Sequence, residues 1–300
     1  MSFCYPSPLC PGDRVALVAP SGPCEPNLFF QMLGWIQGRY QVQVQPGILA
    51  RKGYLAGDDQ RRREELSSAF CDPGIKAVIA VRGGYGATRI VDALPWEELK
   101  KHPKWLVGMS DCTALHLEVN RRSITSIHAG GTMHLCQSPY ASVHRADLMR
   151  LLEHPDASYQ WPALSILHPG GAQGPLMGGN LALLEATAAA GRLAFPSGVI
   201  LALEDVAEAP YRIDRMLTAL RLGGYLKKVG GIVFGKFTRS KPGRYGVSTE
   251  EVLIECTRDL AIPVYADAPF GHGTRNRAFI LGSWVTLRKG TVTFEQKKGE

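Results

Sequence analysis

One stretch organises the chain: Trp105-Leu-Val-Gly-Met-Ser-Asp-Cys-Thr-Ala-Leu-His116. It begins with a short apolar run, passes through Gly108-Met109-Ser110-Asp111, and continues with apolar residues at helical spacing. This order predicts a strand, a tight turn and a helix. A serine on such a bend stands clear of the strand, and the backbone N–H of Asp111 can donate to an oxyanion. Ser110 is therefore a candidate nucleophile.

The same turn has a simpler interpretation. Ser110 or Asp111 can cap the N-terminus of the helix, as both residue types often do. The glycine two positions before the serine fits the G-x-S-x-G pattern, but Cys112 stands where that pattern has its second glycine. Taken alone, the stretch leaves both interpretations open.

The composition is that of a globular protein. The chain has 300 residues, of which 45% are hydrophobic and 20% charged, enough for a large core in one or two domains. A net charge of +7 suits an acidic ligand, but the basic residues are scattered. The tightest basic cluster, Arg61-Arg62-Arg63, is followed by Glu64-Glu65 on a predicted helix, which favours a solvated face over a nucleic-acid site.

Targeting and metal-binding patterns are absent from the sequence. The N-terminus does not have the pattern of a signal peptide, and no apolar run is long enough to cross a bilayer. The seven cysteines are dispersed without CxxC spacing, so we expect a reduced, cytoplasmic protein. The histidines show no HExxH and no Cys/His ligand pairing, so neither a metal nor another cofactor is expected.

Strands and helices alternate in the first half of the chain. Buried strands are predicted at 14–20, 76–81 and 105–108, and helices at 28–37, 58–70 and 87–94. Right-handed crossovers then give a parallel sheet whose loops gather at the carboxyl edge. The loop at Gly83-Gly84 and the turn at Ser110 leave that same edge, so we expect them to face each other.

The second half begins after a change in composition. Proline, glycine and isolated aromatic residues between 154 and 174 predict a domain boundary, which gives domains 1–160 and 175–300 with a linker at 161–174. A strand at 199–203 ends in Glu204-Asp205, and another at 263–267 leads to His272. A two-residue hairpin is predicted within 284–295.

Ser110, Glu204 and His272 all follow predicted strands. Serine is a poor nucleophile at neutral pH and needs a base such as imidazole, which a carboxylate can orient. The alternatives are a loop histidine bonded to the backbone and an exposed carboxylate at a strand end. Because Ser110, Glu204 and His272 all lie at the ends of predicted strands, we favour the catalytic interpretation.

The loop Arg82-Gly83-Gly84-Tyr85-Gly86 also follows a strand. It is a poor dinucleotide-binding loop, because a third glycine is missing at Arg89 and no acidic residue ends a following strand. A glycine here allows a main-chain N–H to approach a substrate carbonyl closely. A plain tight turn remains an equal alternative.

The Ser110 turn and the Gly83-Gly84 loop resemble motifs of the LD-carboxypeptidases. Three further stretches add to the resemblance, which covers nearly the whole chain: Gly178-Gly-Asn-Leu181, Leu203-Glu-Asp-Val206 and Phe270-Gly-His272. This family of serine peptidases includes muramoyltetrapeptide carboxypeptidase and the microcin C self-immunity peptidase. The resemblance implies an α/β fold with a flavodoxin-like N-terminal domain, a smaller strand-rich C-terminal domain, and a homodimer. It also implies Ser110 as nucleophile, Glu204 as orienting acid, His272 as base, and an oxyanion hole from the N–H groups of Asp111 and Gly84.

The resemblance further implies removal of the terminal D-alanine from a murein tetrapeptide during peptidoglycan recycling. Candidate ligands for the substrate carboxylate are Arg82, Arg212 and Arg275, since a guanidinium can hold a carboxylate with two hydrogen bonds. Gly273-Thr274 stand where enterobacterial-type members have an acidic residue and a glutamine, so contacts from that loop are not carried over.

Three alternatives remain. An immunity-type peptidase would cleave acyl-sulfamoyl adenylates and needs an aromatic surface, for which Tyr85, Trp161 and Trp284 are candidates. A catalytically silent ligand-binding module is the second alternative. The third is a nicotinamide dehydrogenase, against which the incomplete glycine fingerprint argues.

Overall fold

The computed structural model describes residues 3–295, which form two compact units. The N-terminal unit consists of residues 3–155 together with Asn276–Leu281. The C-terminal unit consists of Asp156–Arg275 together with residues 282–295. The chain therefore leaves the N-terminal unit and later returns to it.

The N-terminal unit contains a six-stranded sheet in the order β12-β5-β4-β3-β1-β2. Its strands are β1 (Arg14–Val18), β2 (Gln41–Val44), β3 (Ile75–Ala80), β4 (Trp105–Gly108), β5 (Ser126–His128) and β12 (Phe279–Leu281). The first five are parallel, and β12 pairs antiparallel with β5. The order β2-β1-β3-β4-β5 is that of flavodoxin, as expected. Every residue of β4 is buried, which suits a central strand covered on both faces.

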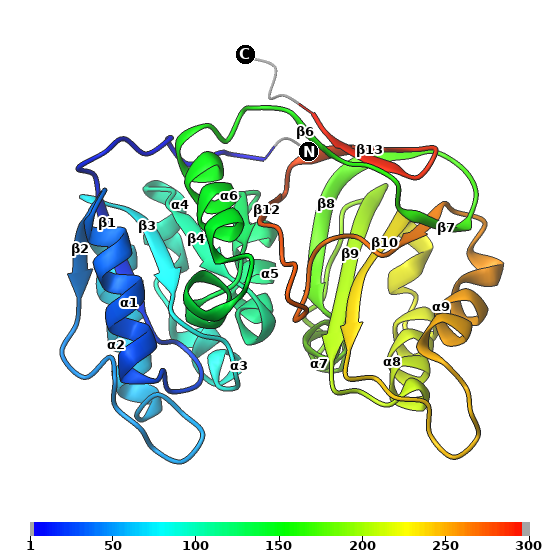
Figure 1. The fold of residues 1–300 in the computed structure, drawn as a ribbon, viewed down its shortest axis with the longest axis horizontal. Helices are drawn as coiled ribbons and strands as arrows, with labels where there is room; N and C mark the ends of the chain where they lie inside the picture. The colour runs from blue at the N-terminus through cyan, green and yellow to red at the C-terminus, as the bar shows by residue number, and fades with distance from the viewer. Residues whose placement is uncertain (1–2, 296–300) are drawn as a thin grey trace. The chain divides into compact units, whose positions relative to one another are not determined.

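The helices of this unit fall into two groups (Figure 1). They are α1 (Pro26–Gln37), α2 (Asp59–Cys71), α3 (Ala87–Ile90), α4 (Trp96–Lys101), α5 (Thr113–Arg121) and α6 (Ala141–Glu153). Helices α1 and α6 both contact the π-helix η3 (Met133–Gln137), whereas α2 contacts α3 and α4, and α3 contacts α5. Right-handed crossovers that run in opposite directions along a parallel sheet place their helices on opposite faces of that sheet. This explains why the helices fall into two groups.

The C-terminal unit contains a mixed eight-stranded sheet in the order β6-β14-β13-β8-β9-β10-β11-β7. The strands are β6 (Tyr159–Trp161), β7 (Ser165–His168), β8 (Ala172–Asn180), β9 (Val199–Val206), β10 (Val229–Thr238), β11 (Val264–Ala266), β13 (Trp284–Arg288) and β14 (Thr291–Phe294). Strands β8 to β11 are parallel and the other four pair antiparallel at the two sides.

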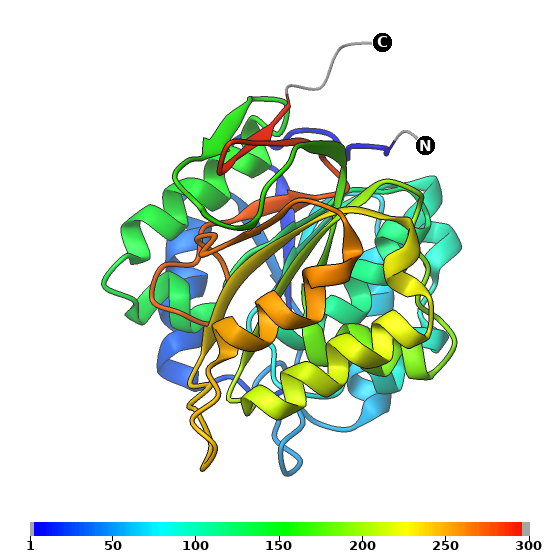
Figure 2. The same cartoon turned by 90° about the vertical axis from the view of Figure 1, so that its right-hand side faces the viewer.

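Three helices accompany this sheet: α7 (Leu181–Ala189), α8 (Pro210–Leu222) and α9 (Thr249–Thr257). Helix α8 contacts both of the others, and Figure 2 shows α8 and α9 side by side across the sheet. Because the strands β8 to β11 are parallel, the loops that leave their carboxyl ends gather at one edge.

Several elements differ from the sequence-based expectations. Helix α6, the π-helix η3 and strand β12 were not predicted, and strands β6, β7 and the start of β8 fall in or beside the span 161–174. The limits 1–160, 161–174 and 175–300 rest on composition and stay a prediction. No helix in the described range 3–295 is long and apolar enough to cross a membrane.

Candidate active site

The Ser110 turn joins β4 to α5 through the one-turn 3-10 helix η2 (Ser110–Cys112). The strand, turn and helix are all present, as predicted. Ser110 has φ +61°, in the left-handed region that is costly for a residue with a Cβ. A Cβ at Gly108 would lie 2.9 Å from the Cys112 Cβ, so only glycine fits there. A strained strand-to-helix bend of this kind is the backbone geometry that a nucleophile elbow requires.

Asp111 is buried, and its carboxylate lies at the N-terminus of α3. The N-cap residues of η2 and α5, Met109 and Cys112, make no side-chain capping hydrogen bond. One carboxylate oxygen of Asp111 accepts a hydrogen bond from the Ala87 N–H at 2.7 Å, and the residue is 1% exposed. Burial raises the pKa of Asp111, against the opposing effect of hydrogen bonds from Ser21 and Ala87.

The Gly83-Gly84 loop lies against the serine, which confirms that the two loops face each other. A Cβ at Gly83 would lie 2.9 Å from the Ser110 Cβ and 3.3 Å from its Oγ. The N–H of Gly22 donates to the Gly83 carbonyl at 2.9 Å, and Gly84 has φ +115°. The side chain of Arg82 is exposed and donates to the Pro23 carbonyl at 2.7 Å, so it ties two loops together.

We expect Gly83→Ala to lower kcat/KM about a hundredfold, because the new Cβ forces the serine or its backbone to shift and small misplacements cost that much. The measurement is steady-state kinetics beside thermal unfolding. Gly34→Ala is the matched control, since a Cβ there meets no atom within 4 Å and alanine favours its helix. Equal activities of the two variants would contradict this role for Gly83.

Glu204 and His272 form a hydrogen-bonded pair in the C-terminal unit. Glu204 lies near the carboxyl end of β9 and is 0% exposed, and its Oε2 lies 2.6 Å from the His272 Nδ1. Gly271 has φ +115°, and a Cβ there would lie 2.9 Å from the Lys236 carbonyl, so glycine permits this approach. Burial disfavours the imidazolium, but the hydrogen bond and charge of Glu204 outweigh it and raise the pKa of His272.

A second polar pair, Asn180 and Asp205, supports the first and was missed by sequence reasoning. The Asn180 Nδ2 donates to the Asp205 Oδ1 at 2.9 Å and lies 3.4 Å from the Glu204 Oε1. Asp205 also accepts from the N–H groups of Val206 and Ala182, at 2.8 and 2.9 Å. Burial raises the pKa of Asp205 to about 6. Both residues stand in motifs that the sequence singled out, but their pairing requires the β8–β9 register.

The other two arginines lie on the surface of the C-terminal unit. Arg212 on α8 forms an ion pair with Glu208, which precedes the helix, with an N–O distance of 2.6 Å. Arg275 is exposed and lies three residues after His272. In the described part of the chain, no cluster of histidine, cysteine and acidic residues could hold a metal ion.

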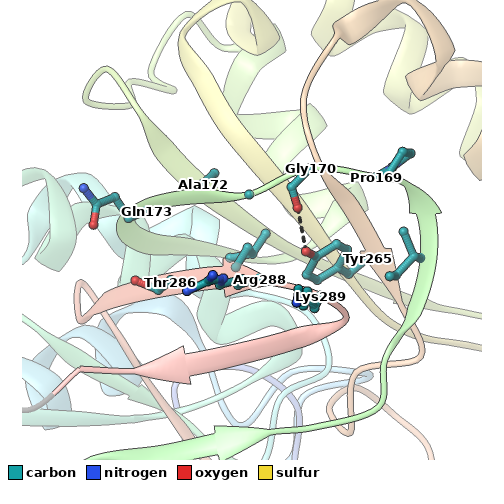
Figure 3. A pocket seen from close by; sticks show the side chains of 11 residues that line it. Pro169, Gly170, Ala172, Gln173, Tyr265, Thr286, Arg288 and Lys289 are labelled. Atoms are coloured by element: carbon teal, nitrogen blue, oxygen red, sulfur yellow. Dashed lines mark hydrogen bonds between the residues drawn. The ribbon is translucent and has the colours of Figure 1, made fainter.

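A cavity of about 660 Å³ lies elsewhere in the C-terminal unit, at the end of β8 away from Asn180 (Figure 3). Its wall includes Tyr265, whose hydroxyl donates to the Gly170 carbonyl at 2.8 Å. None of the predicted site residues lines this cavity.

A serine on a strained turn, together with a buried carboxylate on an imidazole, is the set of groups found in serine hydrolases. The comparison with known proteins agrees with this class. The chain belongs to the LD-carboxypeptidase family, since residues 15–129 match its N-terminal domain and residues 173–287 match its C-terminal domain.

Individual relatives match over nearly the full chain. The sequence is 38% identical to a putative carboxypeptidase of Synechocystis over 98% of both proteins. It is 33% identical to the murein tetrapeptide carboxypeptidase of Pseudomonas aeruginosa, over 91% of this chain and 92% of that protein.

Two solved structures share the fold. The muramoyltetrapeptide carboxypeptidase from Oxalobacter formigenes matches with a TM-score of 0.83 and 28% identity, covering 93% of this chain and 97% of that one. MccF in complex with glutamyl sulfamoyl guanosine matches with a TM-score of 0.89 over 97% and 98%, but at 18% identity this likeness concerns the fold alone.

Proposed function

We propose that the protein is a serine-type LD-carboxypeptidase that removes the terminal D-alanine from a murein tetrapeptide. The observation that supports this most is the hydrogen bond between the buried Glu204 and the His272 Nδ1, because it leaves Nε2 as the basic nitrogen. The names of the Pseudomonas and Oxalobacter relatives support the murein substrate. A homodimer and a cytoplasmic location stay predictions.

In the proposed reaction, the Ser110 Oγ forms a bond to the carbonyl carbon while the His272 Nε2 accepts the hydroxyl proton. The N–H groups of Asp111 and Gly84 stabilise the oxyanion. The bond to D-alanine then breaks, and its nitrogen takes the proton from His272. A water molecule attacks the ester and gives its proton to His272, after which the C–Oγ bond breaks and Ser110 regains the proton. Glu204 stabilises the imidazolium in both steps.

A short chain segment supports the pairing of His272 with Ser110. Four Cα–Cα steps separate His272 from Asn276 and span at most about 14 Å. The Asn276 Nδ2 donates to the Met109 Sδ at 3.0 Å, and Met109 directly precedes Ser110. Chain connectivity therefore limits the distance between the histidine loop and the nucleophile turn in any arrangement of the two units.

The substrate also has a free carboxylate, for which Arg82, Arg212 and Arg275 are the proposed ligands. Of the three arginines, Arg275 is the nearest in sequence to the proposed base His272, which it follows by three residues. It is therefore the strongest candidate ligand for the substrate carboxylate. The Arg212 guanidinium is already paired with Glu208, which weakens its case.

Labelling with a serine-directed fluorophosphonate tests the proposal. We expect the label on the peptide that contains Ser110, with none on the Ser110→Ala protein, and protection by murein tetrapeptide. Activity is assayed in parallel as release of D-alanine. An active wild-type enzyme that is never labelled at Ser110 would overturn the assignment of the nucleophile.

Cleavage of acyl-sulfamoyl adenylates is the second candidate. Tyr85 and Trp284 are exposed enough to stack on a base, whereas Trp161 is buried against Phe270 and Phe294 and is not available. Parallel digestion of both substrate types by the purified protein decides between the two activities.

A further inference from the structure

Two exposed tyrosines lie side by side in the N-terminal unit. Tyr54 is 67% exposed and Tyr85 is 47% exposed, and their ring centroids are 5.7 Å apart in an edge-to-face arrangement. Large aromatic side chains that remain exposed beside a candidate site indicate a binding surface. Because tyrosine has few rotatable bonds, it loses little conformational entropy when it binds a ligand.

Tight backbone contacts fix this pair relative to the nucleophile turn. Tyr54 lies in a turn closed by two hydrogen bonds between the backbones of Lys52 and Leu55, at 2.9 and 3.1 Å. A Cβ at Gly22 would lie 3.6 Å from the Tyr54 carbonyl and 3.0 Å from the Gly83 carbonyl. Three loops therefore pack together through their main chains, and one of them contacts Ser110.

Leu55 completes this packing. It is buried, and a Cβ at Gly86 would lie 2.8 Å from its Cδ2. Leu55 and Gly86, which directly follow the two tyrosines in sequence, are thus packed against each other. The two aromatic side chains are held on a rigid base, which is what a preorganised subsite requires.

We propose that Tyr54 and Tyr85 form the subsite for the muramoyl sugar of the substrate, a proposal that rests on the function proposed above. Three residues separate the sugar from the scissile bond of a muramoyl tetrapeptide, and three extended α-linked residues span about 11 Å. Tyr85 is two Cα–Cα steps from Gly83, about 7 Å at most, and its side chain extends further. The tyrosine pair thus lies within reach of the sugar, whose C–H face can stack on an aromatic ring.

The test compares two substrates of the same peptide sequence, with and without the muramoyl sugar. For wild type we expect the higher kcat/KM on the sugar-bearing peptide. Tyr54→Ala and Tyr85→Ala should each reduce that preference about tenfold, mainly through KM. Tyr85→Phe keeps the ring and should retain the preference. Phe30→Ala is the matched control, because Phe30 is 59% exposed on α1 of the same unit.

Calorimetric binding of both peptides to the Ser110→Ala protein, with and without Tyr54→Ala or Tyr85→Ala, separates this inference from the proposed function. If wild type cleaves neither peptide, the proposed function fails, and the calorimetry still shows whether the tyrosines favour the sugar. An unchanged preference in both tyrosine variants would overturn the subsite. The subsite would also be overturned if the tyrosine variants lost kcat/KM only on an acyl-sulfamoyl adenylate, because the tyrosines would then bind a nucleobase.

Discussion

Replacing Ser110 with alanine is expected to lower kcat at least about 10⁴-fold without unfolding the protein, because loss of a nucleophile in a catalytic triad costs at least this much. Substrate binding should persist, since no charge and little volume are removed. Release of D-alanine, measured against the unfolding temperature of the variant, checks this result.

Ser123→Ala is the control for this substitution. Ser123 is also a serine in the left-handed region, with φ +57°, and it lies in the same unit. The two variants therefore share the backbone strain and differ in the proposed chemistry. If both lose activity to the same degree, or Ser110→Ala remains active, the mechanism is wrong.

The second large effect is expected for Glu204→Gln, with a fall in kcat of about 10³- to 10⁴-fold. The amide is nearly isosteric but cannot stabilise an imidazolium, and its NH₂ group favours the wrong tautomer at the His272 Nδ1. Glu204 raises the pKa of His272, so removing its charge should lower that pKa. The acidic limb of the kcat/KM profile, which reports the neutral imidazole, should then move to lower pH.

Glu255→Gln makes the same chemical change on α9 of the same unit, at an exposed carboxylate that pairs with Arg258. We expect it to leave both kcat and the pH profile near those of wild type. An acidic limb that stays in place in Glu204→Gln would show that the carboxylate does not act on the catalytic base.

The sequence predicted the fold where a segment carries its own signal. Strand β3 is a buried apolar run, and the helical spacing of α2 lies within one short segment, so neighbouring residues alone indicate both elements. Strand β12 has only three residues, and its pairing with β5 joins parts of the chain more than a hundred residues apart. Such an element depends on tertiary context and leaves no periodic pattern to read.

The candidate site likewise contains residues that local sequence indicates and residues that only the folded structure brings together. Ser110, Glu204 and His272 were recognisable as candidates in the sequence because each ends or follows a strand and carries a reactive group. Asn180 and Asp205 were not, because their link depends on the parallel register that places Asn180 opposite Glu204. The tyrosine pair likewise joins two loops that have no relation in sequence.

The return of the chain at β12 has a consequence for biosynthesis. When residues 3–155 have been made, β5 still presents an unpaired backbone edge, and 156–275 must follow before its partner exists. An open edge of this kind can recruit a strand from another molecule. Overproduction of a fragment that stops near residue 155 should therefore give aggregates rather than a monodisperse domain. Fusing residues 276–281 to the end of that fragment through a short linker should reduce this aggregation.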